Sequence, residues 1–273
     1  MRSIPIYQVD AFVTGDGPFT GNPAAVCPLE EWLDEAVMQR IAAENNLAET
    51  AFLVGAQGNY RIRWFTPQTE VDLCGHATLA AAAIIFDRIE PALDRVTFCS
   101  QSGPLAVARD ADRLALDFPS RPPLPCEVPD ALLAGLGRTP LEIRASRDYL
   151  ARFASEEEVR SLRPDFARLT GLDRLGVIVT APGHDSDFVS RFFAPNAGIP
   201  EDPVTGSAHC TLIPYWSEIL GKKALFARQV SERGGALWCG QEGDRVRIAG
   251  RTALYLEGSI HLGPSQPRAT KPA

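Results

Sequence analysis

The sequence RWFTP at Arg63–Pro67 returns as RFFAP at Arg191–Pro195, 128 residues further along the chain. More matches follow in the same order at offsets of 131 to 132 residues: GHAT at 75–78 with GSAH at 206–209, SQSG at 100–103 with SERG at 231–234, and DR at 112–113 with DR at 244–245. A repeat of constant spacing indicates duplicated structure, and this period is too long for a solenoid. It therefore predicts two similar domains in tandem.

Each copy shows the same order of patterns. Residues 60–64 alternate between apolar and polar types, as a half-buried strand does, and the alanine-rich stretch at 77–86 predicts a buried helix. Short strands separated by turn residues follow. We predict an α+β fold in which each half is a curved, mostly antiparallel sheet or barrel around one central helix. The predicted halves are 1–118 and 126–252, joined by a Pro-rich linker at 119–125, with a strand near 253–263 crossing back to the first half.

Other elements follow from spacing in the same way. Apolar residues four apart predict a helix over 30–45, and a second helix near 159–169 that is interrupted at Pro164. The second copy predicts a helix from about Gly206 to Leu220, followed by strands near 225–230, 236–239, 246–248 and 253–256. We expect the polar, Pro-rich tail from Gly263 onward to be poorly ordered.

Composition restricts the class of protein. The chain has 273 residues, a formal net charge of −7 and 45% hydrophobic residues. An acidic chain lacks the basic face that nucleic-acid binding needs, and no apolar run is long enough for a membrane span. The N-terminus has no apolar segment typical of a signal peptide. The six cysteines form no C-x-x-C pair, so we expect reduced thiols, a cytoplasmic protein and no metal site.

Two loops are candidate ligand-binding segments because each opens an apolar helix. The first contains Asp72 and runs through Cys74 to Gly75 and His76, and the second is Glu201–His209. A helix N-terminus exposes unpaired N–H groups, carries a partial positive charge and suits a small anion such as a carboxylate. Two such termini related by pseudo-symmetry would face each other across a cleft. The alternative is that Asp72, Asp202 and Ser207 only cap their helices.

Two further motifs are less specific. Glu49 stands where a predicted helix gives way to an apolar strand, so it is either a solvated residue at a strand edge or a partly buried acid at a cleft. Asn22 belongs to the GNPAAV segment at 21–26, which can be read simply as a turn that enters a strand.

Taken together, these motifs resemble a known family. They are DAF at 10–12, GNPAAV at 21–26, NLAET at 46–50, CGHAT at 74–78, EDPVTGSAH at 201–209 and GSI at 258–260. In this order they resemble the phenazine biosynthesis PhzF-like family from near the N-terminus to about residue 262. The resemblance implies the diaminopimelate epimerase-like fold, a homodimer, no cofactor, and an isomerase that moves a proton between carbons of a small carboxylic acid.

The resemblance also implies roles for particular residues. Glu49 would be the acid/base, and His76 and Asp202 would assist it. Gly75 and Ser207 would contact the substrate. We add Asn22, Asp72, Cys74 and Gly206 as further predicted substrate-binding residues, because they lie in the same motifs. A proton transfer between carbons needs a base that keeps the proton and returns it. Groups that stabilise the developing negative charge assist that step.

Two other functions stay open at this level. An amino-acid epimerase or racemase would use Glu49, Cys74 or both, because related racemases carry a thiol at the position of Cys74. The second thiol of such enzymes is missing here, since Thr205 stands at the matching position of the repeat. The remaining alternative is a non-catalytic protein that binds a small molecule or another protein. The polar residues His184, Asp185 and Asp187 are expected to be solvated loop residues rather than metal ligands.

Overall fold

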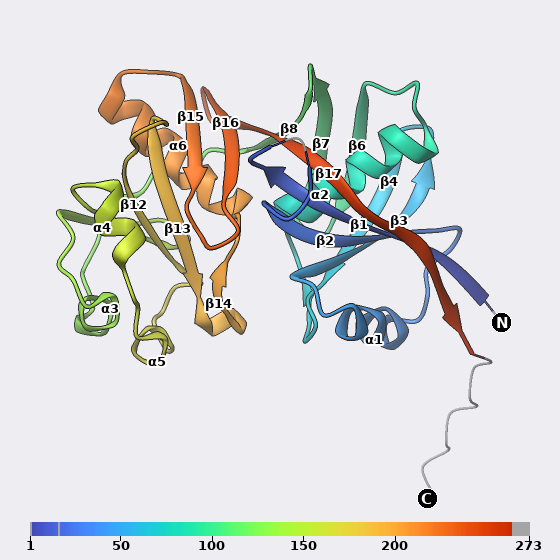
Figure 1. Cartoon of the computed structure of the whole chain (residues 1–273), viewed down its shortest axis with the longest axis horizontal. Helices are drawn as coiled ribbons and strands as arrows, with labels where there is room; N and C mark the ends of the chain where they lie inside the picture. The colour runs from blue at the N-terminus through green and yellow to red at the C-terminus, as the bar shows by residue number, and fades with distance from the viewer. Residues whose placement is uncertain (1, 16, 264–273) are drawn as a thin grey trace, which may run out of the picture.

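The computed structural model describes residues 2–15 and 17–263. The protein has two halves that lie side by side, and in each half β-strands surround a central helix (Figure 1). This confirms the predicted α+β fold with two pseudo-symmetric halves. The predicted boundaries at 118 and 126 remain a prediction, and the tail beyond Gly263 lies outside the described residues.

The N-terminal half is a closed barrel. Each strand pairs with the next around the circle, antiparallel except at the β2–β3 and β4–β6 joins. In order around the barrel the strands are β1 (Arg2–Val13), β2 (Asn22–Leu29), β3 (Glu49–Ala56), β4 (Asn59–Phe65), β6 (Arg95–Ser100), β7 (Gly103–Asp110), β8 (Arg113–Pro119) and β17 (Arg245–Leu262). The short β5 (Glu70–Val71) pairs with the end of β4.

The C-terminal half repeats this order. Its parallel joins, β11–β12 and β13–β15, fall where those of the first half do. The strands are β9 (Leu124–Pro125), β10 (Glu142–Ala145), β11 (Tyr149–Arg152), β12 (Val177–Pro182), β13 (Phe188–Ala194), β14 (Ile199–Asp202), β15 (Ala224–Gln229) and β16 (Gly235–Glu242). The start of β17 pairs with β16 of this half and with β8 of the N-terminal half. The repeat in the sequence is therefore a repeat in strand pairing.

One nonpolar helix fills each half. All residues of α2 (Gly75–Ile84) are buried, and the helix runs on into a π-helical turn, η1 (Ile85–Ile89). The second helix, α6 (Gly206–Leu220), has the bounds that the sequence predicted. A helix surrounded by strands needs no polar face, which explains why α2 is almost free of polar residues. Both helices belong to the main hydrophobic core, which is continuous through the two halves.

Strand β17 links the halves. It begins beside β16 and β8, and from Arg251 onward it pairs with β1 in the N-terminal half (Figure 1). We predicted two strands separated near Gly250, and the structure has one strand of 18 residues. Gly250 is no turn. A Cβ atom there would lie 2.3 Å from Cδ1 of Phe12, so the glycine makes room for a buried ring inside a continuous strand.

Smaller helices cover the outside. They are α1 (Glu35–Asn45), α3 (Asp130–Leu136), α4 (Glu156–Ser161), α5 (Phe166–Leu169) and the 3-10 turn η2 (Pro195–Ala197). Helix α1 begins five residues later than predicted, with Asp34 at its N-cap. The break between α4 and α5 confirms the predicted interruption at Pro164. None of the helices in the described ranges is long and apolar enough to cross a membrane.

Candidate active site

The N-termini of the two central helices meet between the halves. Both begin with glycine, and a Cβ atom added to Gly206 would lie 3.5 Å from the Cα of Gly75. A single methyl group added to either glycine would therefore already be in van der Waals contact with the other helix. Beside it lies a cleft of about 490 Å³ that residues of both halves line. Unpaired N–H groups of two helices therefore converge on one cavity, which is the arrangement expected for binding an anion.

Glu49 and His76 form the acid–base pair of the cleft. Glu49 is the first residue of β3, His76 is the second of α2, and both are buried. Oε2 of Glu49 lies 3.0 Å from Nε2 of His76. Neither atom has an aligned hydrogen-bond partner among the described residues, so both keep unused hydrogen-bonding capacity at the wall of the cleft. The structure thus brings together two residues that the sequence places 27 positions apart.

Asn22 joins this pair to the other half. Its Nδ2 group donates to Oδ1 of Asp202 at 2.7 Å and to the carbonyl oxygen of Val204 at 2.9 Å, and it lies 3.1 Å from Nδ1 of His76. The two oxygen acceptors fix which end of the amide is nitrogen, and they use both of its hydrogens. Asn22 is therefore held in place between Asp202 and His76, and is not only a residue of a turn.

The loop before α6 is held by a second amide. Gln229 of β15 accepts a hydrogen bond from the Thr205 N–H at 2.9 Å and donates to the carbonyl oxygen of Asp202 at 2.7 Å. The hydroxyl of Thr205 donates to Oδ2 of Asp202. Sequence reasoning missed Gln229 and Thr205, because a buried glutamine in a distant strand has no local signal of this role.

Cys74 lies on the other side of the imidazole. It occupies the N-cap of α2, makes no side-chain cap hydrogen bond, and its Sγ atom is 3.5 Å from Nδ1 of His76. Glu49, Cys74 and His76 each offer a ligand atom within 4.8 Å of the others, so this set could hold a metal ion. Spacing along the sequence could not reveal it, because Glu49 comes from a separate strand. The absence of a metal remains a prediction.

The remaining predicted residues also line the cleft. Asp72, Gly75, Gly206 and Ser207 all border it. The capping alternative does not hold, since the N-caps are Cys74 and Thr205, and neither helix has a side-chain cap hydrogen bond. Asp72 instead accepts from the Ser102 hydroxyl through its backbone oxygen at 2.9 Å.

A second feature that the sequence analysis missed positions these loops. Arg63 makes a paired contact with the carboxylate of Glu70, and Arg191 makes the same contact with Glu201. The members of each pair lie on corresponding strands of the two halves, and Glu70 and Glu201 are 131 residues apart. This offset is that of the repeat, so the repeat could have revealed them. Arginine–carboxylate forks of this kind fix geometry as well as adding energy.

Burial and neighbouring charges shift the pKa values of the site. Burial raises the pKa of Asp202 to about 6, and the charge of Glu49 acts in the same direction against His76, Thr205 and Asn22. Burial raises the pKa of Cys74 to about 11, which keeps it a thiol at neutral pH. For His76, burial lowers the pKa, but the interactions of the imidazole with Cys74 and with the Glu49 carboxylate outweigh burial and hold the pKa above its ordinary value.

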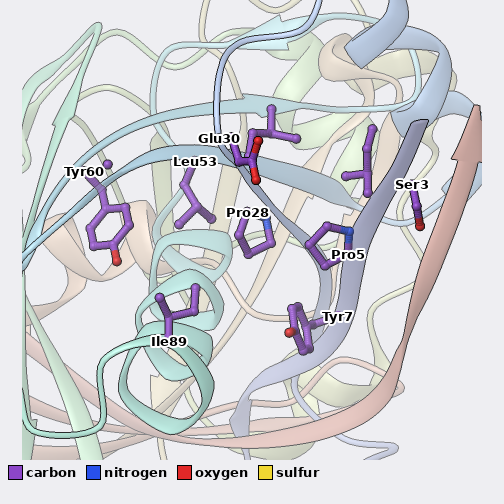
Figure 2. A pocket seen from close by; sticks show the side chains of 11 residues that line it. Ser3, Pro5, Tyr7, Pro28, Glu30, Leu53, Tyr60 and Ile89 are labelled. Carbon is purple, nitrogen blue, oxygen red and sulfur yellow. The ribbon is translucent and has the colours of Figure 1, made fainter. Parts of the chain in front are cut away.

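Another cavity of about 500 Å³ lies at the far end of the N-terminal barrel. Its wall is formed by residues such as Tyr7, Pro28, Leu53 and Ile89 (Figure 2). Glu30 is the one charged side chain in this lining, so the cavity brings no acid–base pair together. The interdomain cleft is therefore the candidate active site.

The pKa of Asp202 predicts a pH effect on stability. Its folded value of about 6 exceeds the ordinary value of 3.8, so its stabilising contribution is complete below pH ~3.8 and is lost as the pH rises through 6. Between pH 4 and pH 7 the wild-type free energy of unfolding should fall by about 2–3 kcal/mol relative to that of Asp202→Asn. Urea unfolding of both proteins across this range measures it. Parallel pH profiles would contradict the assignment.

Known proteins resemble the chain over almost its whole length. The sequence pattern of the phenazine biosynthesis-like protein family matches residues 9–258. An uncharacterized isomerase of Pseudomonas aeruginosa is 54% identical over 95% of this chain and 99% of its own. A crystal structure of a PhzF family protein from Enterococcus faecalis has a TM-score of 0.92 and 49% identity, and covers 96% of this chain and 100% of its own. A hydroxyproline epimerase of Agrobacterium vitis shares the fold, with a TM-score of 0.64 at 10% identity over 95% of this chain and 92% of its own.

Proposed function

This chain belongs to the phenazine biosynthesis-like protein family, has the diaminopimelate epimerase-like fold and is an isomerase. We propose that the enzyme moves a proton between carbons of a small carboxylic acid without a cofactor, with Glu49 as the acid/base. The observation that carries the proposal is the 3.0 Å contact between the Glu49 carboxylate and the His76 imidazole. This contact lies in the cleft where the two helix N-termini meet.

The chemical step uses groups of this chain alone. Glu49 takes a proton from a substrate carbon, so a C–H bond breaks, an O–H bond forms, and the electron pair moves into the adjoining unsaturated system. Return of a proton from this carboxyl group to another carbon completes the isomerisation and restores the carboxylate. While Glu49 holds the proton it exchanges with solvent, so deuterium enters the product in D₂O. His76, which holds a proton on the nitrogen that faces Glu49, stabilises the negative charge that develops in between. Asp202 and Asn22 fix the orientation of the imidazole.

The substrate carboxylate belongs at the helix N-termini. The first backbone N–H groups of α2 and α6 and the hydroxyl of Ser207 border the cleft there. Binding the carboxylate at this point places the neighbouring carbons beside Glu49. It also brings positive helix ends to the place where negative charge accumulates.

Proton exchange with solvent tests the proposal. The protein is incubated in D₂O with a panel of unsaturated and amino carboxylic acids, and loss of C–H signals is followed by proton NMR. We expect at least one acid to exchange a C–H hydrogen, with a new C–H position appearing in the product. Failure of every acid to exchange or isomerise, with binding of some of them demonstrated in the same samples, would favour the non-catalytic alternative.

Epimerisation is the second candidate, because of the contact between Cys74 and His76. A thiol and a carboxylate on two sides of one imidazole could serve opposite faces of a single carbon. Cys74→Ser then distinguishes the reactions. In an epimerase the variant should lose inversion by about 100-fold or more, while one-sided exchange by Glu49 continues. In a proton-shifting isomerase both rates should stay within a few-fold of the wild type. Chiral chromatography and deuterium uptake measure the two rates separately.

We also propose that the chain forms a homodimer. The outer part of β17 exposes Leu254, Tyr255 and Leu256, and the exposed ring of Phe19 lies edge-on to Tyr255 at 5.8 Å. Exposed apolar residues that are contiguous commonly mark an association surface. Light scattering of the purified protein, with Tyr255→Glu as the comparison, tests this assembly.

A further inference from the structure

The cleft contains a cation that the proposed chemistry does not use. Arg147 lies in the turn between β10 and β11, and its side chain lines the cleft from the C-terminal half. The other charged lining side chains are Glu49, Glu70, Asp72, Asp202 and His76. Several acidic side chains in one cavity repel an anionic substrate unless nearby cations offset their charge. Whether the Arg147 guanidinium is free to bind a ligand therefore affects which substrates the cleft accepts.

Among the described residues, hydrogen bonds or ion pairs engage acids of the cleft but not Arg147. Glu49 faces His76, Asp202 accepts from Asn22 and Thr205, and Glu70 accepts from Arg63 and from Gln101. Within residues 2–15 and 17–263, the Arg147 guanidinium makes neither a hydrogen bond nor a salt bridge.

The carboxylate that follows Arg147 makes no salt bridge with it among the described residues. Asp148 is buried, and its Oδ1 atom has no hydrogen-bond partner there. Burial raises the pKa of Asp148, and the charge of Arg147 only partly opposes that shift. The guanidinium of Arg147 therefore remains available to a ligand in the cleft, where its five N–H donors suit a carboxylate or phosphate.

Arg147 is also separate from the reacting groups. Glu49, His76 and Cys74 form the buried floor of the cleft, with exposures of 9%, 4% and 6%. The lining beside Arg147 is more open, since Leu175 is 38% exposed and Arg147 itself is half-buried. A substrate whose carboxylate reaches the helix N-termini at the floor would thus extend toward Arg147 at the mouth. A volume of about 490 Å³ leaves room for such a two-ended molecule.

We propose that Arg147 binds a second anionic group of the substrate, so that the enzyme selects acids with a carboxylate at each end or with a carboxylate and a phosphate. Arg147 is a specificity-determining residue in this assignment. The inference rests on the proposed function for the position of the first carboxylate, but binding at Arg147 needs no proton transfer. It can therefore be tested without turnover.

Affinities for three acids of similar length provide the test. Glutarate has two carboxylates, pentanoate has one, and 4-phosphonobutanoate carries a phosphonate in place of the second. Dissociation constants are measured by ligand-observed NMR for the wild type, Arg147→Met and Arg147→Lys. Arg40→Met is the matched control, because it removes the same charge from the exposed face of α1, outside the cleft.

We expect the wild type and Arg40→Met to bind at least one dianion about tenfold more tightly than pentanoate. Arg147→Met should reduce this preference to less than twofold, and Arg147→Lys should keep part of it. A preference confined to glutarate identifies a carboxylate end, and one confined to 4-phosphonobutanoate identifies a phosphate end. The proposal is overturned if the wild type prefers neither dianion, or if Arg147→Met keeps the preference. Either result leaves the exchange assay for Glu49 unaffected, so the two proposals fail separately.

Discussion

Replacement of Glu49 by glutamine is expected to lower the rate of substrate C–H exchange by about a thousandfold. Glutamine has the same shape and can still face His76, but its amide cannot take up and return a proton at neutral pH. Positioned general acid–base groups contribute roughly 10²–10⁴-fold. Ligand affinity should change little, because the helix N-termini and Ser207 remain. The exchange rate is measured in D₂O with an acid that the wild type turns over, and affinity by titration of the same acid.

Glu70→Gln is the matched control for that experiment. Glu70 is another carboxylate of the same cleft, but it is engaged by Arg63 rather than by His76. A glutamine oxygen can still accept from Arg63 and hold the loop, so the replacement should leave exchange within a few-fold of the wild type. Equal losses in both variants would indicate a general electrostatic effect of removing negative charge. Undiminished exchange in Glu49→Gln would remove Glu49 from the reaction altogether.

The duplicated architecture could be predicted because the same physical constraints apply twice. Each half has a nonpolar helix inside its strands, a glycine where the two helices meet, and an arginine that fixes the loop before the helix. These shared requirements place matching residues at a nearly constant offset in the sequence. The continuity of β17 could not be predicted, because glycine is typical of turns, whereas Gly250 lies in extended conformation within the strand. Its reason is the ring of Phe12, which is distant in the sequence.

The site was predictable to the extent that its residues sit in distinctive local motifs. Asn22, Glu49, His76 and Asp202 each belong to such a motif, and the structure brings them into one network. Gln229 and Arg147 have ordinary surroundings in the sequence. The roles that we propose for them depend on the side chains that the fold places beside them, and for Arg147 on the lack of a hydrogen bond or salt bridge in the described chain. Local motifs therefore predict the residues that meet in the cleft more readily than they predict partners from distant strands and turns.

A large loss of stability from a single methyl group is expected for Gly21→Ala. Gly21 has φ of +73°, and a Cβ atom there would lie 2.3 Å from the carbonyl oxygen of Ala11. Its own N–H donates to the Gly234 oxygen at 2.7 Å, and its carbonyl accepts from Arg233 at 2.9 Å. The turn therefore cannot move without breaking contacts to the other half. Left-handed strain of about 1–2 kcal/mol and forced displacement of backbone should together lower the free energy of unfolding by about 3–4 kcal/mol.

Gly243→Ala separates the two contributions. Gly243 has a similar φ of +67°, but a Cβ atom there meets nothing within 4 Å, so only the conformational strain of about 1 kcal/mol should appear. Urea unfolding of both variants gives the difference. Because Asn22 follows Gly21 directly, the folded fraction of Gly21→Ala should also lose activity by tenfold or more, whereas Gly243→Ala should keep it. Equal destabilisation in the two variants would mean that the Ala11 carbonyl yields freely and that this turn does not fix Asn22.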